Sequence, residues 1–274
     1  MILNFTLGLA LSTIVGLVAY KKHWLNVSGV VGLLAIGTSL FIGGGWTWFA
    51  ILIVFFASSS LLTLYRFEDK RFLDNIVAKP GARDIWQALA NGGIGALNGL
   101  VYSFYPEKVI FVAFLGAIAA VNADTWAVEI GVLSKSDPVL ITTGKRVTPG
   151  TSGGISALGT LATAAGALFI GLISWALVSI NSSLFNSESD YRWILPVTLL
   201  GGIAGSTFDS LLGATVQSTY YCECCHKETE RVVHTCGQKT KLIKGWRWLG
   251  NDWVNFLSSL VGSVVAILVY STLY

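Results

Sequence analysis

The strongest constraint in this sequence is a series of long apolar stretches, each able to cross a lipid bilayer. A hydrocarbon core of about 30 Å takes about 20 apolar residues in a helix. The stretches lack the period-2 alternation of barrel strands, so helices are expected to satisfy their backbone hydrogen bonds. We therefore predict an all-α fold, a polytopic transmembrane bundle of about eight spans. They cover residues 2–20, 25–42, 46–64, 88–105, 107–131, 154–180, 194–214 and 253–273.

Composition supports one integral membrane domain over residues 1–274. Charged residues make up 12% of the chain, about half the share usual in soluble domains. The first span has no basic residue before it and no clear small-residue cleavage site after it, so we expect a retained helix rather than a cleaved signal peptide. The fourth span is the least hydrophobic, because Asn91, Gly92, Gly93 and Asn98 interrupt it, and a re-entrant segment is its alternative.

Basic residues indicate on which side of the membrane each loop lies. All 18 Lys and Arg residues except Lys108 and Arg192 fall in the loops that follow odd-numbered spans. Cytoplasmic loops of membrane proteins carry an excess of these residues. We therefore predict that the odd loops are cytoplasmic, that both termini lie outside, and that the protein resides in the cell membrane.

Acidic and amide side chains lie near the cytoplasmic ends of several spans. Such groups are costly in a bilayer and usually face the bundle interior or a water-filled cavity. Acids at one depth repel one another unless a cation lies among them, and Mg²⁺ favours a few carboxylates together with phosphate oxygens. For the amides taken singly, hydrogen bonding between helices is an equally good explanation. The predicted Mg²⁺ ligands are Asp124, Glu129, Asp209 and Asp252, and the accompanying amides are Asn91, Asn122, Asn251 and Asn255.

Two of the basic loops have features of phosphate sites. The loop from Lys145 to Ser156 combines glycines, hydroxyls and two cations directly before a helix N-terminus, where free N–H groups attract anions. A flexible connector is the alternative. In an earlier loop, the planar fork of Arg83 matches phosphate oxygens, although an interfacial anchor has the same composition. The expected phosphate contacts are Arg83, Lys145, Arg146, Thr151, Ser152, Gly153, Gly154 and Ser156.

The cysteines cluster in one cytoplasmic loop, residues 220–247, which we interpret as carrying a small zinc-binding insert. Cys222 and Cys225 form a C-x₂-C pair, and His234 and Cys236 form a second close pair. Four soft ligands at these separations suit tetrahedral zinc. Cys224 and His226 are alternative ligands, and a disulfide is not expected on a cytoplasmic face. The zinc would be structural, because all four coordination positions are filled.

Four segments resemble the integral membrane family known as domain of unknown function 92, which includes the plant phytyl-phosphate kinase. They are residues 122–131, the Lys145–Ser156 loop, residues 205–214 and residues 251–255. The resemblance implies a kinase that transfers phosphate from CTP to a membrane prenyl or phytyl monophosphate. It also implies that Asp124, Thr125 and Glu129 belong to the nucleotide and metal site. The loop would contact the triphosphate, and the pocket would be completed by Asp209, Asn251, Asp252 and Asn255.

We therefore predict a nucleotide-dependent lipid-phosphate kinase whose site lies on the cytoplasmic side of the membrane. Its catalytic residues would be Asp124, Glu129, Asp209 and Asp252, with Lys145 and Arg83 as phosphate clamps. The expected partners are the bilayer, a prenyl or phytyl phosphate and a nucleoside triphosphate, with no nucleic acid and with a homo-oligomer left open. One alternative is a cytidylyltransferase that makes a CDP-lipid. The other is a proton-coupled transporter, although the outer halves of the spans are nearly devoid of the polar residues that transport requires.

Overall fold

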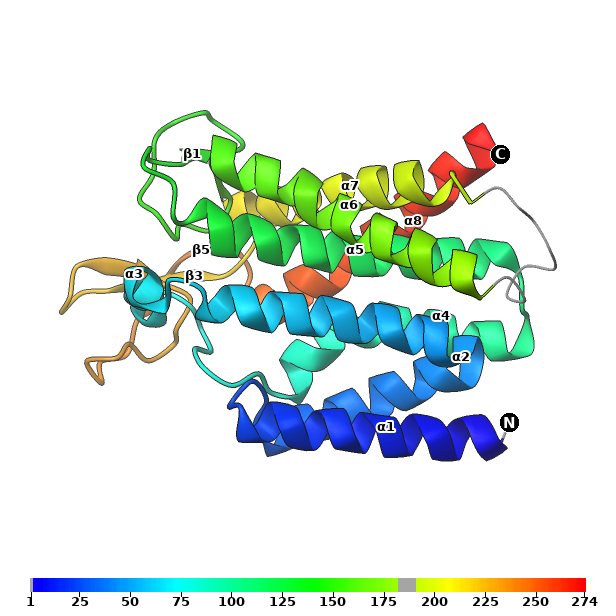
Figure 1. Ribbon diagram of the computed structural model, residues 1–274. Coiled ribbons are helices and arrows are strands. Elements are labelled where there is room, and N and C mark those ends of the chain that lie inside the picture. Colours follow the sequence, from blue (N-terminus) through cyan, green and yellow to red (C-terminus); the bar gives the residue numbers. More distant parts are fainter. Residues whose placement is uncertain (1, 182–190) are drawn as a thin grey trace.

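A computed structural model describes residues 2–181 and 191–274 and shows a bundle of long helices. The helices are α1 (Ile2–Lys21), α2 (Val27–Leu64), the short α3 (Phe67–Lys70) and 3₁₀ helix η1 (Arg71–Asn75), α4 (Ile85–Phe104), α5 (Lys108–Gly131), α6 (Ala157–Ile180), α7 (Ile194–Thr215) and α8 (Asn251–Leu273). They run roughly along one long axis (Figure 1), and α8 packs against α4, α5 and α7.

Within the described residues, 6 helices are long and apolar enough to cross a membrane, namely α1, α2, α5, α6, α7 and α8. Helix α4 has the length of a span but contains Asn91 and Asn98 and is not one of the six. This agrees with the sequence, in which the fourth stretch is the least hydrophobic. The number of crossings and their orientation stay predictions.

Helix α2 is a hairpin of two arms that reverses at Gly45. The φ of Gly45 is 62°, a left-handed value that glycine adopts without strain. The ring of Trp24, just before the first arm, lies 5.9 Å from that of Phe56 in the second arm. A straight helix would hold these residues roughly 45 Å apart at 1.5 Å per residue. The two arms therefore correspond to the separate stretches expected at residues 25–42 and 46–64.

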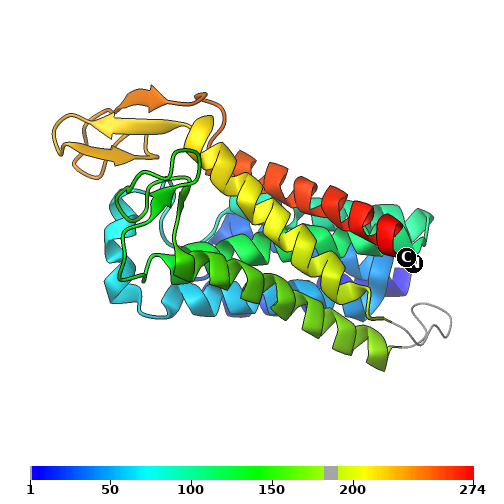
Figure 2. The ribbon, with the colours of Figure 1, turned by 90° about the horizontal axis from the view of Figure 1, so that it is seen from above.

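The bundle has two unlike ends. The described N- and C-terminal residues lie together at one end, and α3 and all of the short strands lie at the other (Figure 1). The turned view shows the strands beyond the start of α8 (Figure 2). We call the end with the strands the loop end and the opposite one the closed end. The loop end carries the basic loops, so it is the end for which the sequence predicts a cytoplasmic location.

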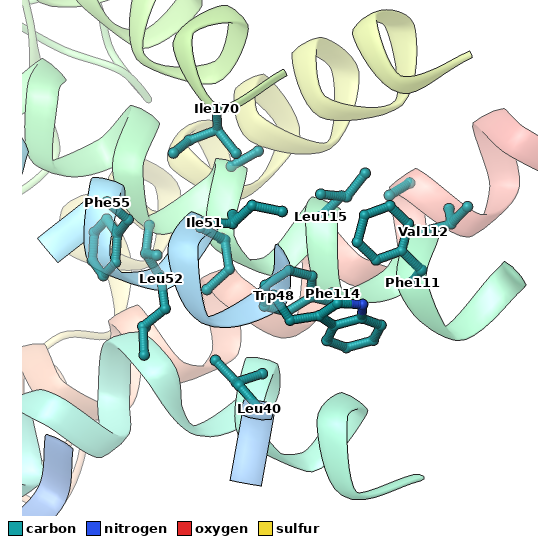
Figure 3. Packing of buried hydrophobic residues seen from close by; sticks show 14 of the residues in the cluster. Leu40, Trp48, Ile51, Leu52, Phe55, Phe111, Val112, Phe114, Leu115 and Ile170 are labelled. Atoms are coloured by element: carbon teal, nitrogen blue, oxygen red, sulfur yellow. The ribbon is translucent and has the colours of Figure 1, made fainter. Parts of the chain in front are cut away.

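Aromatic and small residues pack the interior. Trp48 lies 4.4 Å from Phe114 and 5.2 Å from Phe111, ring centroid to ring centroid, and all three are 0% exposed (Figure 3). Helices α5 and α7 approach closely, because a Cβ at Gly205 would come 2.3 Å from the Cβ of Ala120. Small residues allow such close backbone contact in membranes. One turn further along, this contact places Asp124 of α5 and Asp209 of α7 on facing surfaces of the two helices.

The all-α prediction holds for the spans but not for the loops, which contain five short strands in the described part of the chain. Strands β1 (Val139–Leu140) and β2 (Gly154–Ile155) pair antiparallel, and β3 (Thr219–Cys222) pairs antiparallel with both β4 (Lys227–Thr229) and β5 (Lys241–Lys244). We call residues 219–244 the Cys/His ribbon. Short strands form here because the polar loops must pair their backbone groups locally.

Candidate functional site

A cavity of about 1350 Å³ opens at the loop end of the bundle. Its walls come from α2, α4, α5, α6, α7 and α8 and from the segments between them. It brings together most of the site residues expected from the sequence. Those that line it are Arg83, Asn91, Asp124, Thr125, Glu129, Thr151, Ser152, Gly153, Gly154, Ser156, Asp209, Asn251, Asp252 and Asn255.

Two of the four carboxylates face the cavity with hydroxyl groups as their hydrogen-bond donors. The Ser206 hydroxyl donates to Asp124 over 3.2 Å, and the Ser258 hydroxyl donates to Asp209 over 3.2 Å. Ser206 lies one helical turn before Asp209 on α7, so Asp124 and Asp209 project from facing helices. Their remaining oxygen lone pairs are available to a cation. These two acids are thus the best placed of the four to bind a divalent metal ion.

The other two carboxylates form ion pairs with lysines from the segment before α4. Lys70 lies 2.5 Å from Glu129, which also accepts a 2.6 Å hydrogen bond from Thr63. Lys79 bridges Asp252, at 2.6 Å, and Asp84, at 2.9 Å. Partial burial would lower the pKa of Lys79, but its bonds to the two carboxylates outweigh that effect and the pKa is raised. Lys79 is therefore a firmly charged ammonium at neutral pH.

Arg83 supplies a further positive charge in the cavity wall. Its guanidinium donates to the Ser60 hydroxyl over 2.9 Å and lies 6.0 Å from the centre of the Phe56 ring. Burial lowers the pKa of Arg83, while the nearby Glu129 opposes the change. An arginine remains protonated despite such a shift because its ordinary pKa is above 12.

The loop before α6 reaches the cavity through its glycines and hydroxyls. Ser156 is the N-cap of α6, and its side chain accepts a 3.1 Å hydrogen bond from the N–H of Gly159. Gly153 has a φ of 83°, and a Cβ there would come 2.4 Å from the backbone nitrogen of Ala214, so only glycine fits. Lys145 and Arg146 are exposed and lie outside the cavity lining. The loop thus offers backbone and hydroxyl donors rather than its two cations.

The amides have different environments. Asn122 is 0% exposed, donates to the Gly166 carbonyl over 2.7 Å and accepts from Ser58 over 3.1 Å, so it joins α5 to α6 and α2. Asn91 lines the cavity and donates to the Gln87 carbonyl over 2.9 Å. Thr125 also lines it, with its hydroxyl donating to the Val121 carbonyl over 2.8 Å.

The cysteine and histidine residues of the ribbon form a candidate metal centre. The ligand atoms of Cys222, Cys225, His234 and Cys236 all lie within 4.8 Å of one another. The Cys222 and Cys236 sulfurs are 3.6 Å apart, and His234 Nδ1 is 3.4 Å from the Cys236 sulfur. Tetrahedral zinc with bonds of ~2.3 Å places its sulfur ligands ~3.8 Å apart. The cluster can therefore hold a metal ion such as zinc, and the alternative ligands Cys224 and His226 lie outside it.

Comparison with known proteins identifies the family. The family model for the integral membrane protein DUF92 matches residues 10–263. The chain belongs to the DUF92 family. Protein PGR of Arabidopsis thaliana is 33% identical to it over 270 residues, which cover 92% of this chain and 91% of that protein. Uncharacterized membrane protein MJ0933 of Methanocaldococcus jannaschii is 29% identical over 262 residues, or 95% and 92% of the two chains.

A more distant relative is Protein VTE6, chloroplastic, of Arabidopsis thaliana. It is 22% identical over 249 residues, which cover 89% of this chain and 65% of that protein. No solved structure gives a significant match. Membership of the DUF92 family agrees with the resemblance read from the sequence motifs.

The DUF92 chain also places in its cavity residues that the sequence did not single out. Glu230, from the Cys/His ribbon, accepts hydrogen bonds from Ser152 at 3.0 Å and Gln217 at 2.7 Å. Burial raises the pKa of Glu230, and the hydrogen bonds from Ser152, the Ala78 N–H and Gln217 only partly offset that rise. Its neighbour Arg231 donates to the Asp74 carbonyl over 2.9 Å. The ribbon therefore ties the loop before α6 to the segment that carries Lys70 and Lys79.

In this DUF92 protein the cavity combines three chemical functions. Among the described residues, Asp124 and Asp209 have hydroxyl donors and no basic side chain as partners, whereas Arg83, Lys70 and Lys79 supply positive charge. The N-terminal end of α6 supplies donors for an anion. Groups of these kinds are the ones with which proteins bind phosphate.

Proposed function

We propose that this protein is a nucleotide-dependent kinase that phosphorylates a membrane prenyl or phytyl monophosphate to the diphosphate. The observation that carries the proposal is the placement of Asp124 and Asp209 beside the α6 loop and Arg83 in one cavity at the end of a membrane bundle. The motif resemblance to the family that includes the plant phytyl-phosphate kinase supports it. CTP is the donor that the resemblance favours.

In the proposed reaction, an oxygen of the lipid monophosphate bonds to the γ-phosphorus of the nucleotide. The bond from that phosphorus to the β–γ bridging oxygen breaks, and the nucleoside diphosphate leaves with the electron pair. The acceptor is already an anion, so no side chain needs to remove a proton. The work of the protein is positioning and charge neutralisation, as in phosphoryl transfer generally.

Individual residues take roles that follow from their contacts. Asp124 and Asp209 would hold Mg²⁺, which supplies positive charge to the transferring phosphate oxygens. Ser152 and Ser156, with the loop glycines, would orient the triphosphate. Glu129 and Asp252 would act through lysines, because they hold Lys70 and Lys79 in place.

Product analysis tests the proposal. The purified protein in lipid nanodiscs would be given Mg²⁺, CTP labelled at either the α- or the γ-phosphate, and a panel of prenyl monophosphates. We expect the γ-label, and not the α-label, to appear in a lipid diphosphate, and we expect Asp124→Asn to lower the rate of transfer about a thousandfold. Transfer of the α-label would identify a CDP-lipid cytidylyltransferase. Absence of product from every lipid and nucleotide pair would overturn the kinase assignment.

A further inference from the structure

We propose that Glu230 is a positioning residue that links the metal-bound fold of the Cys/His ribbon to the loop before α6, and so makes nucleotide binding depend on the ribbon metal. Glu230 lies in the chain between the two pairs of candidate metal ligands. The cavity lining includes Glu230 but not the four candidate ligands, all of which the structure describes. The inference rests on the proposed kinase function and specifies how a metal ion outside the cavity acts on its nucleotide site.

The side chain of Glu230 joins three segments of the chain. Its Oε1 accepts hydrogen bonds from the Ser152 hydroxyl at 3.0 Å and from the Gln217 amide at 2.7 Å. Its Oε2 accepts a 3.3 Å hydrogen bond from the N–H of Ala78. Gln217, which follows α7, is 2% exposed and therefore supports the carboxylate from the side of the bundle. A carboxylate with three donors has a fixed direction, so Ser152 is held from outside its own loop.

The backbone around Glu230 is fixed on the segment before α4. The N–H of Glu230 donates to the Ile76 carbonyl over 2.8 Å, and the hydroxyl of Thr229 donates to the same carbonyl over 3.0 Å. On the other side, the guanidinium of Arg231 donates to the Val77 carbonyl over 3.0 Å. Glu230 can therefore move away from Ser152 only if this part of the ribbon leaves the segment.

The candidate metal ligands lie on both sides of that part of the ribbon. Cys222 pairs with Lys227 where β3 meets β4, and Cys225 lies in the turn between these strands. His234 and Cys236 follow Glu230 in the chain. A metal ion bound by both pairs closes residues 226–233 into a loop, and small metal sites commonly supply much of the folding free energy of such a segment. We therefore expect loss of the metal to release Glu230.

The loop before α6 depends on supports from outside. Ser152 lies between Gly150 and Gly153, whose φ values are 88° and 83°. Glycine loses more conformational entropy on folding than any other residue, so a loop built on it needs contacts to hold one shape. Gly150 packs on Leu73, because a Cβ there would come 2.8 Å from the Leu73 side chain. The Ser152 side chain rests on Glu230, and without that bond the loop should hold a triphosphate less firmly.

Hydrogen–deuterium exchange tests the link without reference to catalysis. The full chain in nanodiscs, loaded with Zn²⁺, would be compared with Glu230→Ala. We expect exchange in residues 149–156 to rise about tenfold, because the loss of a hydrogen bond to a charged group permits local opening. Exchange in residues 232–244 should stay as in wild type. Glu228→Ala, at an exposed position of the same ribbon, is the matched control. Unchanged exchange of the loop in Glu230→Ala would overturn the proposal.

Two further variants separate loss of this bond from loss of the ribbon fold. Ser152→Ala removes the other partner and leaves the ribbon sequence intact, so it should raise exchange in residues 149–156 to the same extent. Glu230→Gln keeps an acceptor oxygen for Ser152 and Gln217 and should restore most of the protection. In kinetics, Glu230→Ala should raise the KM for CTP about tenfold and leave the KM for the lipid acceptor unchanged. Equal changes in both KM values would contradict a role in positioning the nucleotide loop.

Removal and return of Zn²⁺ tests the dependence on metal. Chelation should raise both the exchange of residues 149–156 and the KM for CTP in wild type, and added Zn²⁺ should reverse both changes. In Glu230→Ala the link is already broken, so chelation should change these two quantities much less. Coupled sites give such non-additive effects. Effects of chelation and of Glu230→Ala that simply add would show that the ribbon acts on the loop by another route.

Failure of this link and failure of the kinase assignment give different results. Diphosphate formation with a loop whose exchange is independent of Glu230 and of Zn²⁺ removes the link alone. Loop exchange that responds to both, in a protein that transfers no phosphate to any lipid, removes the kinase assignment alone.

Discussion

The two ends of the helical bundle differ in what fills the space between the same helices. At the closed end, the Trp48 ring packs against the rings of Phe111, Phe114 and Tyr102, and this aromatic cluster joins α2, α4 and α5. At the loop end, α5 and α7 instead place Asp124 and Asp209 around an open cavity. Among the described residues, the cavity that contains these acids is lined by the loop end of the bundle.

This difference helps to distinguish two kinds of protein that carry acidic residues within a membrane bundle, namely transporters and lipid-modifying enzymes. A transporter must open its central site to each side in turn, and its polar groups therefore continue toward both. An enzyme that acts on a lipid phosphate needs only one opening, at the level of the headgroups. The aromatic closed end favours the enzyme.

The largest expected effect comes from the acids of the open end. Asp124→Asn and Asp209→Asn should each lower kcat/KM about a thousandfold, which corresponds to about 4 kcal/mol, because each removes charge that would neutralise the transferring phosphate. Measurement of diphosphate formation with long-chain acceptors checks this. Asp137→Asn, in an exposed loop at the same end, is the control. Activity within tenfold of wild type in both variants would remove these two acids from the site.

The next effect concerns the closed end. Trp48→Ala should lower the free energy of unfolding by about 3 kcal/mol, because a fully buried aromatic side chain loses its packing contacts. The activity of the folded protein should change less than twofold. Thermal unfolding in detergent and initial rates measure the two quantities, with the exposed Trp175→Ala as the control. A large loss of activity without loss of stability would show that the two ends are coupled, as a transporter requires.

Removal of metal from the ribbon should have a smaller effect on the loop end. Cys236→Ser, or treatment with a zinc-selective chelator, should reduce activity about tenfold and expose residues 219–244 to proteolysis. The reason is that the ribbon holds Asn75 and Ile76 through the Thr229 hydroxyl, at 3.0 Å each. Cys224→Ser, outside the cluster, is the matched control. Unchanged protease protection after chelation would show that the ribbon folds without metal.

The smallest effect concerns Glu230. Burial raises the pKa of this carboxyl group. A carboxylic acid with a raised pKa in the folded protein is protonated more readily there than in the unfolded chain. Stability therefore falls as pH rises from the ordinary value of 4.5 through the raised pKa. Glu230→Gln should remove this dependence, at about 1.4 kcal/mol per tenfold change in proton affinity. The free energy of unfolding of wild type and variant, determined at pH 4 and at pH 8, measures this dependence. The same difference between the two proteins at both pH values would contradict the expected shift.

The features that could be predicted best from the sequence are those that the lipid bilayer determines. The positions of the apolar helices follow from the thickness of the bilayer, and the separation of the α2 arms follows from the interruption around Gly45. The metal ligands follow from their spacing, since Cys222, Cys225, His234 and Cys236 do gather. The location of Asp124 and Asp209 at one depth follows from the direction of their helices.

Features that depend on the path of a loop could not be predicted in the same way. In the sequence, Lys70 and Lys79 indicate only that their loop lies on the cytoplasmic side. Their ion pairs with Glu129 and Asp252 become apparent only in the folded chain. Glu230 lies inside the cysteine-rich insert, which the sequence presents as separate from the acids. Lys145 and Arg146 belong to a glycine-rich loop, but the direction in which their side chains point depends on how this part of the loop pairs with β1.

The reversal at Gly45 also bears on how the protein is made. A single residue forms the turn between the arms, so no hydrophilic loop has to be carried through the bilayer between them. We therefore expect the two arms to enter the lipid together, as one pair. In such a pair each arm would support the other, and together they would form the surface against which α4 packs.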